Sequence, residues 1–273
     1  MKHLKLSLLA FSIIFATACK NDKKETEEVK DTTEQTATKE TPKQSKIAIA
    51  PLTDSPAYAN AKLMLDTPET MTIAKAGDVD FNFTLEDYAL GDQTDSANAQ
   101  KLANSGKGQH IHFILNNQPY SAHYEPNIKK EIPAGVHHLV AFLSRSYHES
   151  VKNDNSMVVR KLVVGENAQD SLGLDMDAPT LIYSRPKGTY VGKDTENLLL
   201  DFFVLNTELS ETGNKVLATI NGEEFTIHQW APHVVTGLPM GEVTINLQLV
   251  DAEGNVLPGP FNTVERKVTL KAE

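Results

Sequence analysis

Beyond residue 46, apolar and polar residues alternate in short runs that are typical of β-strands. The segments 81–85, 111–115 and 139–143 each place an apolar side chain at every second position. This period of two puts the apolar side chains on one face of an extended strand. The runs end at turn signals such as Asn116-Asn117 and Pro133–Gly135. No segment of this part shows a long helical period, so the pattern predicts an all-β fold.

The same series of strands occurs twice along the chain. The segments 200–204, 216–220 and 245–249 repeat the apolar pattern of the three segments above, in the same order. Short strands at regular spacing with Gly and Pro turns are typical of immunoglobulin-like β-sandwiches. We therefore expect two tandem sandwiches, at residues 47–166 and 174–273.

The repeat separates scaffold from candidate function. A residue type found in both copies is expected to serve the fold, whereas one found in a single copy is a candidate for binding. The first copy carries an additional segment, Gly91–Gly108, directly before its histidine-bearing strand. Because binding sites often lie on loops at the end of a rigid sandwich, we expect this segment to cover a site.

The N-terminus has the composition of a secretion signal. Lys2 and Lys5 precede a short apolar run and small residues, so residues 1–18 are interpreted as a signal peptide. Cys19 follows and is the single cysteine, which excludes an internal disulfide framework, a Cys-based zinc site and CxxC redox chemistry. Residues 19–46 hold almost no apolar side chains and are expected to be a disordered tether.

A lone cysteine after small residues resembles the lipobox of bacterial lipoproteins, although Ala16 stands where that pattern prefers Leu. The resemblance implies a lipid on Cys19 that anchors the protein in a Gram-negative cell envelope, in the outer membrane, on its periplasmic or surface face. The chain carries 36 acidic against 26 basic residues, a net charge of −10. Such an excess of acid argues against nucleic acid or an anionic membrane surface as the main partner.

Three of the nine histidines lie in one expected β-hairpin. His110 and His112 are two apart, so both point to one face of their strand, opposite Ile111 and Phe113. A turn centred on Asn116-Asn117 would place His123 across from His110. A turn one residue later would place it across from His112, so either register keeps the three on one face.

A fourth histidine, His148, is expected to approach His110 from the next hairpin. Converging imidazoles suit Zn²⁺ or Cu²⁺, so His110, His112 and His148 are the candidate metal ligands, with Glu125 or Glu149 available to complete the set. A polar strand face that binds nothing is the alternative, because a single H-x-H pattern is a weak metal signal.

The second copy helps to sort the histidines. It has Lys215 and Leu217 at the positions of His110 and His112, so the fold does not require these two imidazoles. His123 is matched by His228 and is interpreted as scaffold. Of the remaining histidines, His137 is expected in the core, and His138 and His233 at the surface.

A second candidate site is basic. Arg145 and Lys152 flank His148 on a predicted hairpin tip, and Arg185 and Lys187 lie near the start of the second domain. Arginine suits bidentate contact with phosphate or carboxylate, although solvated charges on a hairpin tip are the simpler alternative. The candidate anion-binding residues are Arg145, Tyr147, His148, Lys152, Arg185 and Lys187.

Signatures of catalysis are lacking in the sequence. It contains no GxSxG, no HExxH and no glycine-rich phosphate loop. A single tryptophan, Trp230, also argues against an aromatic platform for glycans. We therefore expect a binding protein and not an enzyme.

Two resemblances bear on this expectation. The order H-x-H, then Pro-x-Gly-x-His, then a strand ending before Tyr147-His148, resembles an uncharacterised His-rich exported bacterial domain. His110, His112, His137 and His148 match that domain, and Ile111 replaces its third opening histidine. More extensively, "GQHIHFI", "AFLSRSYHES", "YSRPKGTY" and "GLPMGE" resemble two-domain bacterial lipoproteins often labelled phosphopeptide-binding. That resemblance implies a peptide or protein partner.

Three hypotheses follow. The first is phosphopeptide- or anion-type binding, assisted by protonated imidazoles and therefore stronger as pH falls through about 6.5. The second is capture of Zn²⁺ or Cu²⁺ by neutral imidazoles, for which protonation competes with the metal and the pH trend is opposite. The third is a structural spacer without a ligand.

Overall fold

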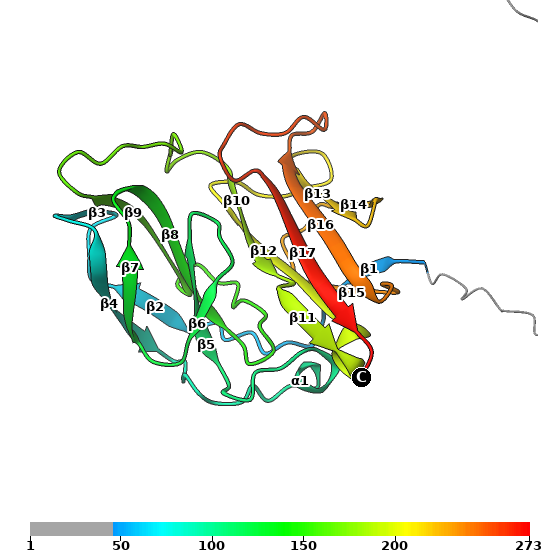
Figure 1. Cartoon of the computed structure of the whole chain (residues 1–273). Helices are drawn as coiled ribbons and strands as arrows, with labels where there is room; N and C mark the ends of the chain where they lie inside the picture. The colour runs from blue at the N-terminus through cyan, green and yellow to red at the C-terminus, as the bar shows by residue number, and fades with distance from the viewer. Residues whose placement is uncertain (1–45) are drawn as a thin grey trace, which may run out of the picture. The chain divides into compact units, whose positions relative to one another are not determined.

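The computed structural model describes residues 46–273, which form two β-sandwiches (Figure 1). The predicted signal peptide (1–18), the lipidation site Cys19 and the predicted tether (19–46), apart from Lys46, lie outside the described residues. The prediction of an all-β chain with two tandem immunoglobulin-like sandwiches is confirmed. Within residues 46–273, no helix has the length and apolar character needed to span a bilayer.

The first sandwich combines a three-stranded and a five-stranded sheet. The smaller sheet has the order β2 (Lys62–Leu65), β4 (Gly77–Glu86), β7 (Asn127–Ile132). The larger has the order β3 (Thr70–Ile73), β9 (Met157–Val164), β8 (Gly135–Ser144), β5 (His110–Leu115), β6 (Ser121–His123). All neighbours are antiparallel except β3 and β9, which run parallel.

The second sandwich repeats this arrangement. One sheet has the order β1 (Ala48–Pro51), β15 (His233–Thr236), β12 (Leu198–Leu205), β10 (Thr180–Arg185). The other has the order β11 (Gly188–Val191), β17 (Thr263–Lys271), β16 (Gly241–Val250), β13 (Lys215–Ile220), β14 (Glu223–Ile227). Here too the first edge strand is parallel, β11 beside β17. The short helix α1 (Asn98–Lys101) and a 3₁₀ turn (Gly192–Thr195) complete the described elements.

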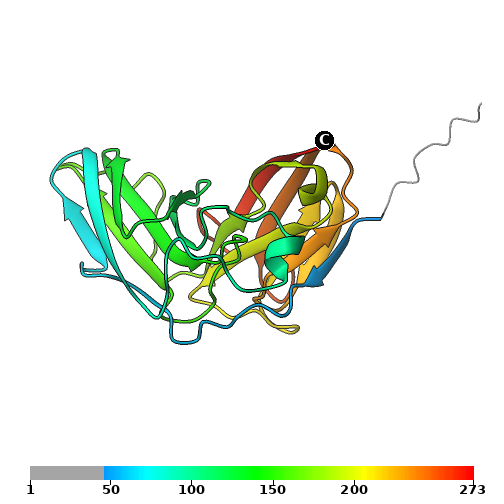
Figure 2. The same cartoon turned by 90° about the horizontal axis from the view of Figure 1, so that it is seen from below.

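One predicted boundary is wrong. Residues 48–51 were assigned to the first domain, but β1 pairs antiparallel with β15 of the second sandwich, Ala48 facing Thr236. Ile47 is buried in the second core. Figure 2 shows the blue β1 at the edge of the second sandwich, from which the chain crosses to the first. The described residues 46–273 therefore begin and end in the same sandwich, through a pairing between distant segments that no local pattern encodes.

Each sandwich has its own core, built from the alternating residues that the sequence indicates. Phe81 and Phe83 of β4 are buried in the first core, and Leu200 and Phe202 of β12 take the matching places in the second. The segments 111–115 and 216–220 correspond in the same way. The internal repeat is thus structural, because each inward face packs against the opposite sheet of its own sandwich.

The outward faces of the two sandwiches differ. Ile114 of β5 and Phe142 of β8 point away from the first core and pack in a further cluster with Ile182, Phe203 and Phe261 of the second sandwich. Strand β8 is consequently buried on both faces along nearly its whole length. The face of β5 that carries His110 and His112 therefore faces the second sandwich and not solvent.

The additional segment of the first copy closes one end of this region. Leu102, just after α1, is buried against Tyr147 and Leu199 of β12. The Ser105 amide donates a hydrogen bond of 2.8 Å to the Ser146 carbonyl. The segment thus lies over the hairpin that carries His148, as expected for a cover.

Candidate functional site

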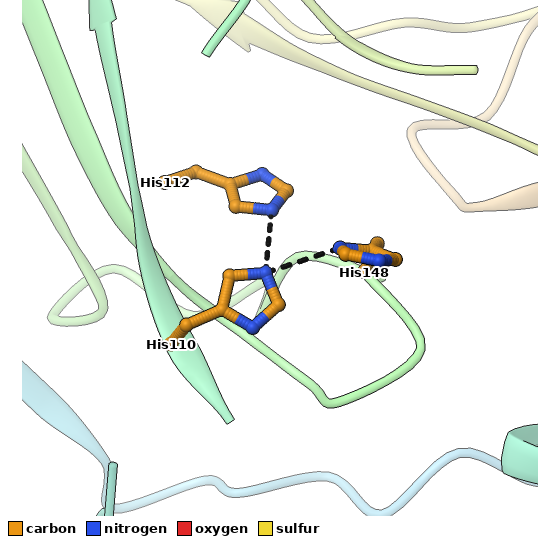
Figure 3. A group of neighbouring side chains, drawn as sticks. All are labelled: His110, His112 and His148. Atoms are coloured by element: carbon orange, nitrogen blue, oxygen red, sulfur yellow. Dashed lines mark hydrogen bonds between the residues drawn. The ribbon is translucent and has the colours of Figure 1, made fainter. Parts of the chain in front are cut away.

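His110 and His112 project from β5 into a closed space. Both side chains are fully buried, and their Nε2 atoms lie 2.9 Å apart. Figure 3 shows the two rings side by side, with their Nε2 atoms facing each other. Two strand positions apart is the spacing that puts both imidazoles on one face of the pleat.

His148 reaches the pair from the hairpin that joins β8 to β9. The His148 amide donates to the Arg145 carbonyl at 2.9 Å, and the Arg145 amide donates to the Glu149 carbonyl at 2.8 Å. This tight loop places His148 at φ +70°, in the left-handed region. Its Nδ1 atom lies 3.1 Å from Nε2 of His110, the same atom that His112 faces (Figure 3). The predicted approach of His148 to His110 is therefore correct.

The second copy has the same hairpin with other side chains. The Gly254 amide donates to the Asp251 carbonyl at 3.2 Å, and the Asp251 amide donates to the Asn255 carbonyl at 2.9 Å. Gly254 stands where the first copy has His148, and its φ is +89°. Glycine adopts this conformation readily, whereas a residue with a Cβ is strained in it. A histidine at this turn position is thus not explained by the turn.

The outer ring nitrogens orient the inner ones. Nδ1 of His110 lies 2.8 Å from the Gly108 carbonyl oxygen, and Nδ1 of His112 lies 3.3 Å from the Ser184 hydroxyl. A carbonyl only accepts hydrogen bonds, so Nδ1 of His110 carries the proton and its Nε2 presents a lone pair to the centre. Histidine ligands of metals are commonly held in this way by a second partner.

Burial keeps all three imidazoles neutral. It lowers the pKa of His110 to about 4, a change that the hydrogen bond to the Gly108 carbonyl opposes. Burial is also the first cause that lowers the pKa of His112 and of His148, followed by positive neighbours that include Arg185 and Lys187. The neutral form is the one that binds metals. Protonated imidazoles near pH 6.5, as the anion hypothesis requires, do not fit this environment.

Only these three residues of 46–273 form a group of histidine and acidic side chains suited to hold one ion, with donor atoms all within 4.8 Å. The two acids proposed to complete the set are not members of it. Glu149 is engaged by Arg145 and Ser55, and Glu125 is exposed beyond the end of β6.

Two tyrosines next to the histidines were not foreseen. The Tyr120 ring stacks on His112 with centroids 3.5 Å apart, and its hydroxyl lies 3.4 Å from Nδ1 of His148. The Tyr124 ring lies 5.1 Å from His110, and its hydroxyl is 2.8 Å from that of Ser105 in the covering segment. Their place in the same short hairpin, "QPYSAHY", was the available signal.

His123 does not join the site. It stands across from Ile111, one residue out of either expected register, and its ring packs near Phe113. The reason is the loop between β5 and β6, whose residues Asn116 and Asn117 both adopt positive φ while the turn extends to Tyr120. A shift of one residue moves a strand side chain to the other face.

The predicted basic hairpin tip is also wrong. Arg145 is buried, donates to the carbonyls of Pro56 and Ser150, and forms an ion pair with Glu149 at 3.1 Å. Tyr147 is fully buried and donates to the Ser55 hydroxyl. The covering segment encloses this hairpin, so its polar side chains bond inward and are not free for a ligand.

Of the remaining predicted anion ligands, Lys152 is committed to an ion pair with buried Asp201 at 2.6 Å. Arg185 is buried beside the histidines and donates to the Lys187 carbonyl and the Tyr190 hydroxyl. Lys187 lies over the Tyr120 ring, 4.2 Å from its centroid. Within the described part of the chain, neither Arg185 nor Lys187 has a carboxylate at ion-pair distance.

The predicted burial of the other histidines is correct for His137 and wrong for His138 and His233. His137 is buried, with its ring nitrogens 2.9 Å from Asn116 and from the Pro133 carbonyl, as expected of a core histidine. His138 and His233 were expected at the surface but are 4% and 6% exposed. His138 stacks on Phe261 of the second sandwich, and His233 lies on β15 between β1 and β12. Both are covered by long-range packing.

No protein-family model and no curated protein matches the chain. Among solved structures, it is similar to the fibronectin(III)-like modules of CbhA from Clostridium thermocellum, with 14% identity over 77% of this chain and 94% of that one, and a TM-score of 0.26. It is also similar to SGBP-B of the Bacteroides ovatus mixed-linkage glucan utilization locus, solved with a mixed-linkage heptasaccharide, with 15% identity over 82% of this chain and 47% of that one, and a TM-score of 0.21.

A third similar structure is the central fibronectin-III array of RIM-binding protein, with 11% identity over 73% of this chain and 59% of that one, and a TM-score of 0.23. Likenesses at this level concern the sandwich fold alone. They name no ligand for this chain.

Proposed function

We propose that this chain is a non-enzymatic binding protein that captures Zn²⁺ or Cu²⁺ with His110, His112 and His148. The address proposed from the sequence, a lipid anchor on Cys19 in the cell envelope, would place this site outside the cytoplasm. Two rigid strand positions and one hairpin position supply the three nitrogens. Imidazole nitrogen is a preferred ligand of both metals.

The convergence of three neutral ring nitrogens on one point, from two fully buried histidines and the half-buried His148, is the observation that carries the proposal. His110 and His112 each use Nδ1 on an outer partner, the Gly108 carbonyl and the Ser184 hydroxyl, so their Nε2 atoms are the ones directed at the cluster. An ion would accept the lone pair of His110 and those of its neighbours together. His148 stands where the second copy has Gly254, and this supports the same conclusion. A histidine in the left-handed conformation is strained, and the turn itself would form more easily with glycine.

The spacing of the nitrogens is close to what an ion needs. Metal–nitrogen bonds of about 2.0–2.1 Å in a tetrahedral site place nitrogens about 3.3 Å apart. Nε2 of His110 lies 2.9 Å and 3.1 Å from its two partners, and the three donor atoms lie within 4.8 Å of one another. An ion would therefore open the first two spacings by a few tenths of an ångström and draw His112 and His148 closer together. Three protein ligands leave a further coordination position for water or for an atom of a bound molecule.

The phosphopeptide function implied by the resemblance receives less support. Arg145 and Lys152 are occupied by Glu149 and Asp201, and the imidazoles are neutral. A spacer without a ligand remains the competing proposal, since such sandwiches also serve as structural modules. It is distinguished from metal capture by the experiment below.

Calorimetric titration of the purified chain with Zn²⁺ and Cu²⁺ tests the proposal. We expect micromolar or tighter binding of one ion per chain, lost in His110→Ala/His112→Ala. The matched control is His228→Ala, which removes an exposed imidazole from the second sandwich. Absence of binding, or binding that survives the double substitution, would contradict metal capture and favour the spacer.

A further inference from the structure

A small pocket lies beside the histidine cluster, where the second sandwich meets the loop between β5 and β6. Its volume is about 250 Å³. Pro119, Tyr183 and Pro186 contribute apolar walls, and Lys187, Arg266 and Lys267 contribute positive charge. Ser184, whose hydroxyl faces His112, also lines the pocket, so it is a neighbour of the metal site and distinct from it.

The positive charge of this pocket is not balanced from within. Its lining contains three cationic side chains and no acidic one. Lys267 is paired with Glu242 at 2.8 Å on the exposed rim. Lys187 and Arg266 are half-buried, and no carboxylate of residues 46–273 forms an ion pair with either.

The hydrogen bonds of these two cations are incomplete. Arg266 donates to the carbonyls of Asn117 and Glu265, but its buried Nε has no hydrogen-bond partner among residues 46–273. Lys187 donates to the Tyr120 carbonyl. Burial, followed by the positive charges of Arg185 and Lys130, lowers the pKa of Lys187. Removing a cation even partly from water without a counter-charge costs free energy, and an anion bound between these half-buried side chains would reduce that cost.

From this geometry we infer that the pocket binds the carboxylate of a small organic anion, held by Lys187 and Arg266, with the anion's apolar body against Pro119, Tyr183 and Pro186. The function proposed above does not depend on this site. The whole chain has a net charge of −10, so anions are attracted to this pocket by its local positive charge and repelled by the protein as a whole.

The pocket's shape narrows the ligand class. Pockets for drug-sized molecules measure about 300–1,000 Å³, so this one suits a smaller molecule. The apolar walls disfavour a bare inorganic anion, which keeps its hydration better in water. Two sources present a carboxylate beside an apolar body: a free organic acid, and the C-terminal residue of a peptide with an apolar side chain.

The test is a ¹H–¹⁵N NMR titration of the purified full-length chain with benzoate at low ionic strength. We expect saturable shifts of the amide signals of Ser184, Lys187 and Gly188. Benzamide, which has the same shape and no charge, is expected to bind at least tenfold more weakly. Acetyl-Ala-Ala-Phe with a free C-terminus, compared with its amide, separates the two sources: tighter binding than benzoate identifies the peptide, weaker binding the free acid.

Two variants with the same loss of charge complete the experiment. Lys187→Gln should weaken benzoate binding at least fivefold, and Lys271→Gln, on the exposed end of β17, should leave it unchanged. An unshifted wild-type spectrum, equal binding of benzamide, or equal weakening by both variants would overturn the inference. The benzamide comparison needs no variant and decides the question if Lys187→Gln disturbs the fold.

Discussion

The two hairpins at 144–150 and 250–256 share one backbone and differ in nearly everything else. Both are closed by a bridge between their ends, Ser144 to Ser150 and Val250 to Val256, and both use the same internal backbone hydrogen bonds. In the second copy the loop is exposed, and a glycine takes the left-handed position. In the first copy the loop is buried, and His148 takes that position. The scaffold therefore does not require the histidine.

The strands beside these hairpins show the same contrast. His110 pairs with Ser144 in the first copy, and Lys215 pairs with Val250 in the second. The backbone places these side chains identically, but the first copy presents them to the second sandwich and the second copy presents them to the exterior. Burial against a neighbouring domain is thus what makes the first set a candidate site.

The largest expected effect concerns the polar support of the first hairpin. Arg145→Ala leaves the carboxylate of Glu149 buried without its cation, and breaking a buried pair costs about 3–5 kcal/mol of unfolding free energy. Urea denaturation followed by circular dichroism measures this loss. The matched change in the exposed hairpin, Asp251→Ala, should move the midpoint much less. Equal shifts in both variants would show that burial does not distinguish the two hairpins.

The next largest effect is a loss of metal affinity on substitution of His148, without a matching loss of stability. His148→Gly installs the residue that the second copy uses, so we expect at least a hundredfold loss of Zn²⁺ affinity with little change in thermal stability. The relief of left-handed strain offsets the greater freedom of glycine in the unfolded chain. Calorimetry and a melting curve on the same sample test both parts. A large drop in melting temperature would assign His148 a structural role instead.

A third prediction uses a buried histidine outside the site. Burial lowers the pKa of His138 to about 4, against about 6.5 in the unfolded chain. The unfolded state therefore binds more protons below pH 6.5, and stability present above that pH is lost as pH falls toward 4. This group alone should cost about 2 kcal/mol between pH 7 and pH 5.

The matched variant is His138→Thr, since Thr244 occupies the corresponding place in the second copy. The backbone amides of both residues donate to an asparagine side-chain oxygen, that of Asn116 in the first copy and that of Asn221 in the second. Urea midpoints at pH 7 and pH 5, measured without metal, should differ less in this variant than in the wild type. An unchanged pH dependence would contradict the assignment of a low pKa to His138.

The smallest effect is a gain. Lys215→His, Leu217→His and Gly254→His together transfer the three imidazoles to the second sandwich, in a chain that lacks the native set. Because the registers match, we expect measurable Zn²⁺ binding, but at least tenfold weaker than at the native site, which has outer partners such as Gly108 and Ser184. A complete lack of binding would mean that Zn²⁺ affinity depends less on the backbone register than on the residues that surround the three histidines.

Most of the fold follows from local pattern. The alternation at 81–85 and its repeat at 200–204 indicate strands, an inward face and two copies, because each depends only on neighbouring residues. The pairing of β1 with β15 and the burial of His138 against Phe261 depend on contacts across the chain. Single-sequence periodicity carries no information on those contacts.

The site was predictable to the same extent. His110 and His112 share a face by strand geometry, and His148 approaches through the order of strands in the sandwich. His123 was misplaced because one residue in a turn inverts the face. The exposure of Arg145 and Lys152 was predicted wrongly. The local sequence pattern is that of a solvated hairpin tip, but the second sandwich and the covering segment bury these side chains.

The most direct test of the central claim is a crystal structure of the chain grown with Zn²⁺, with an anomalous difference map recorded at the zinc edge. The account predicts one strong peak between the rings, within about 2.0–2.1 Å of Nε2 of His110, Nε2 of His112 and Nδ1 of His148. No peak there under saturating zinc, or a peak only at exposed carboxylates, would contradict it.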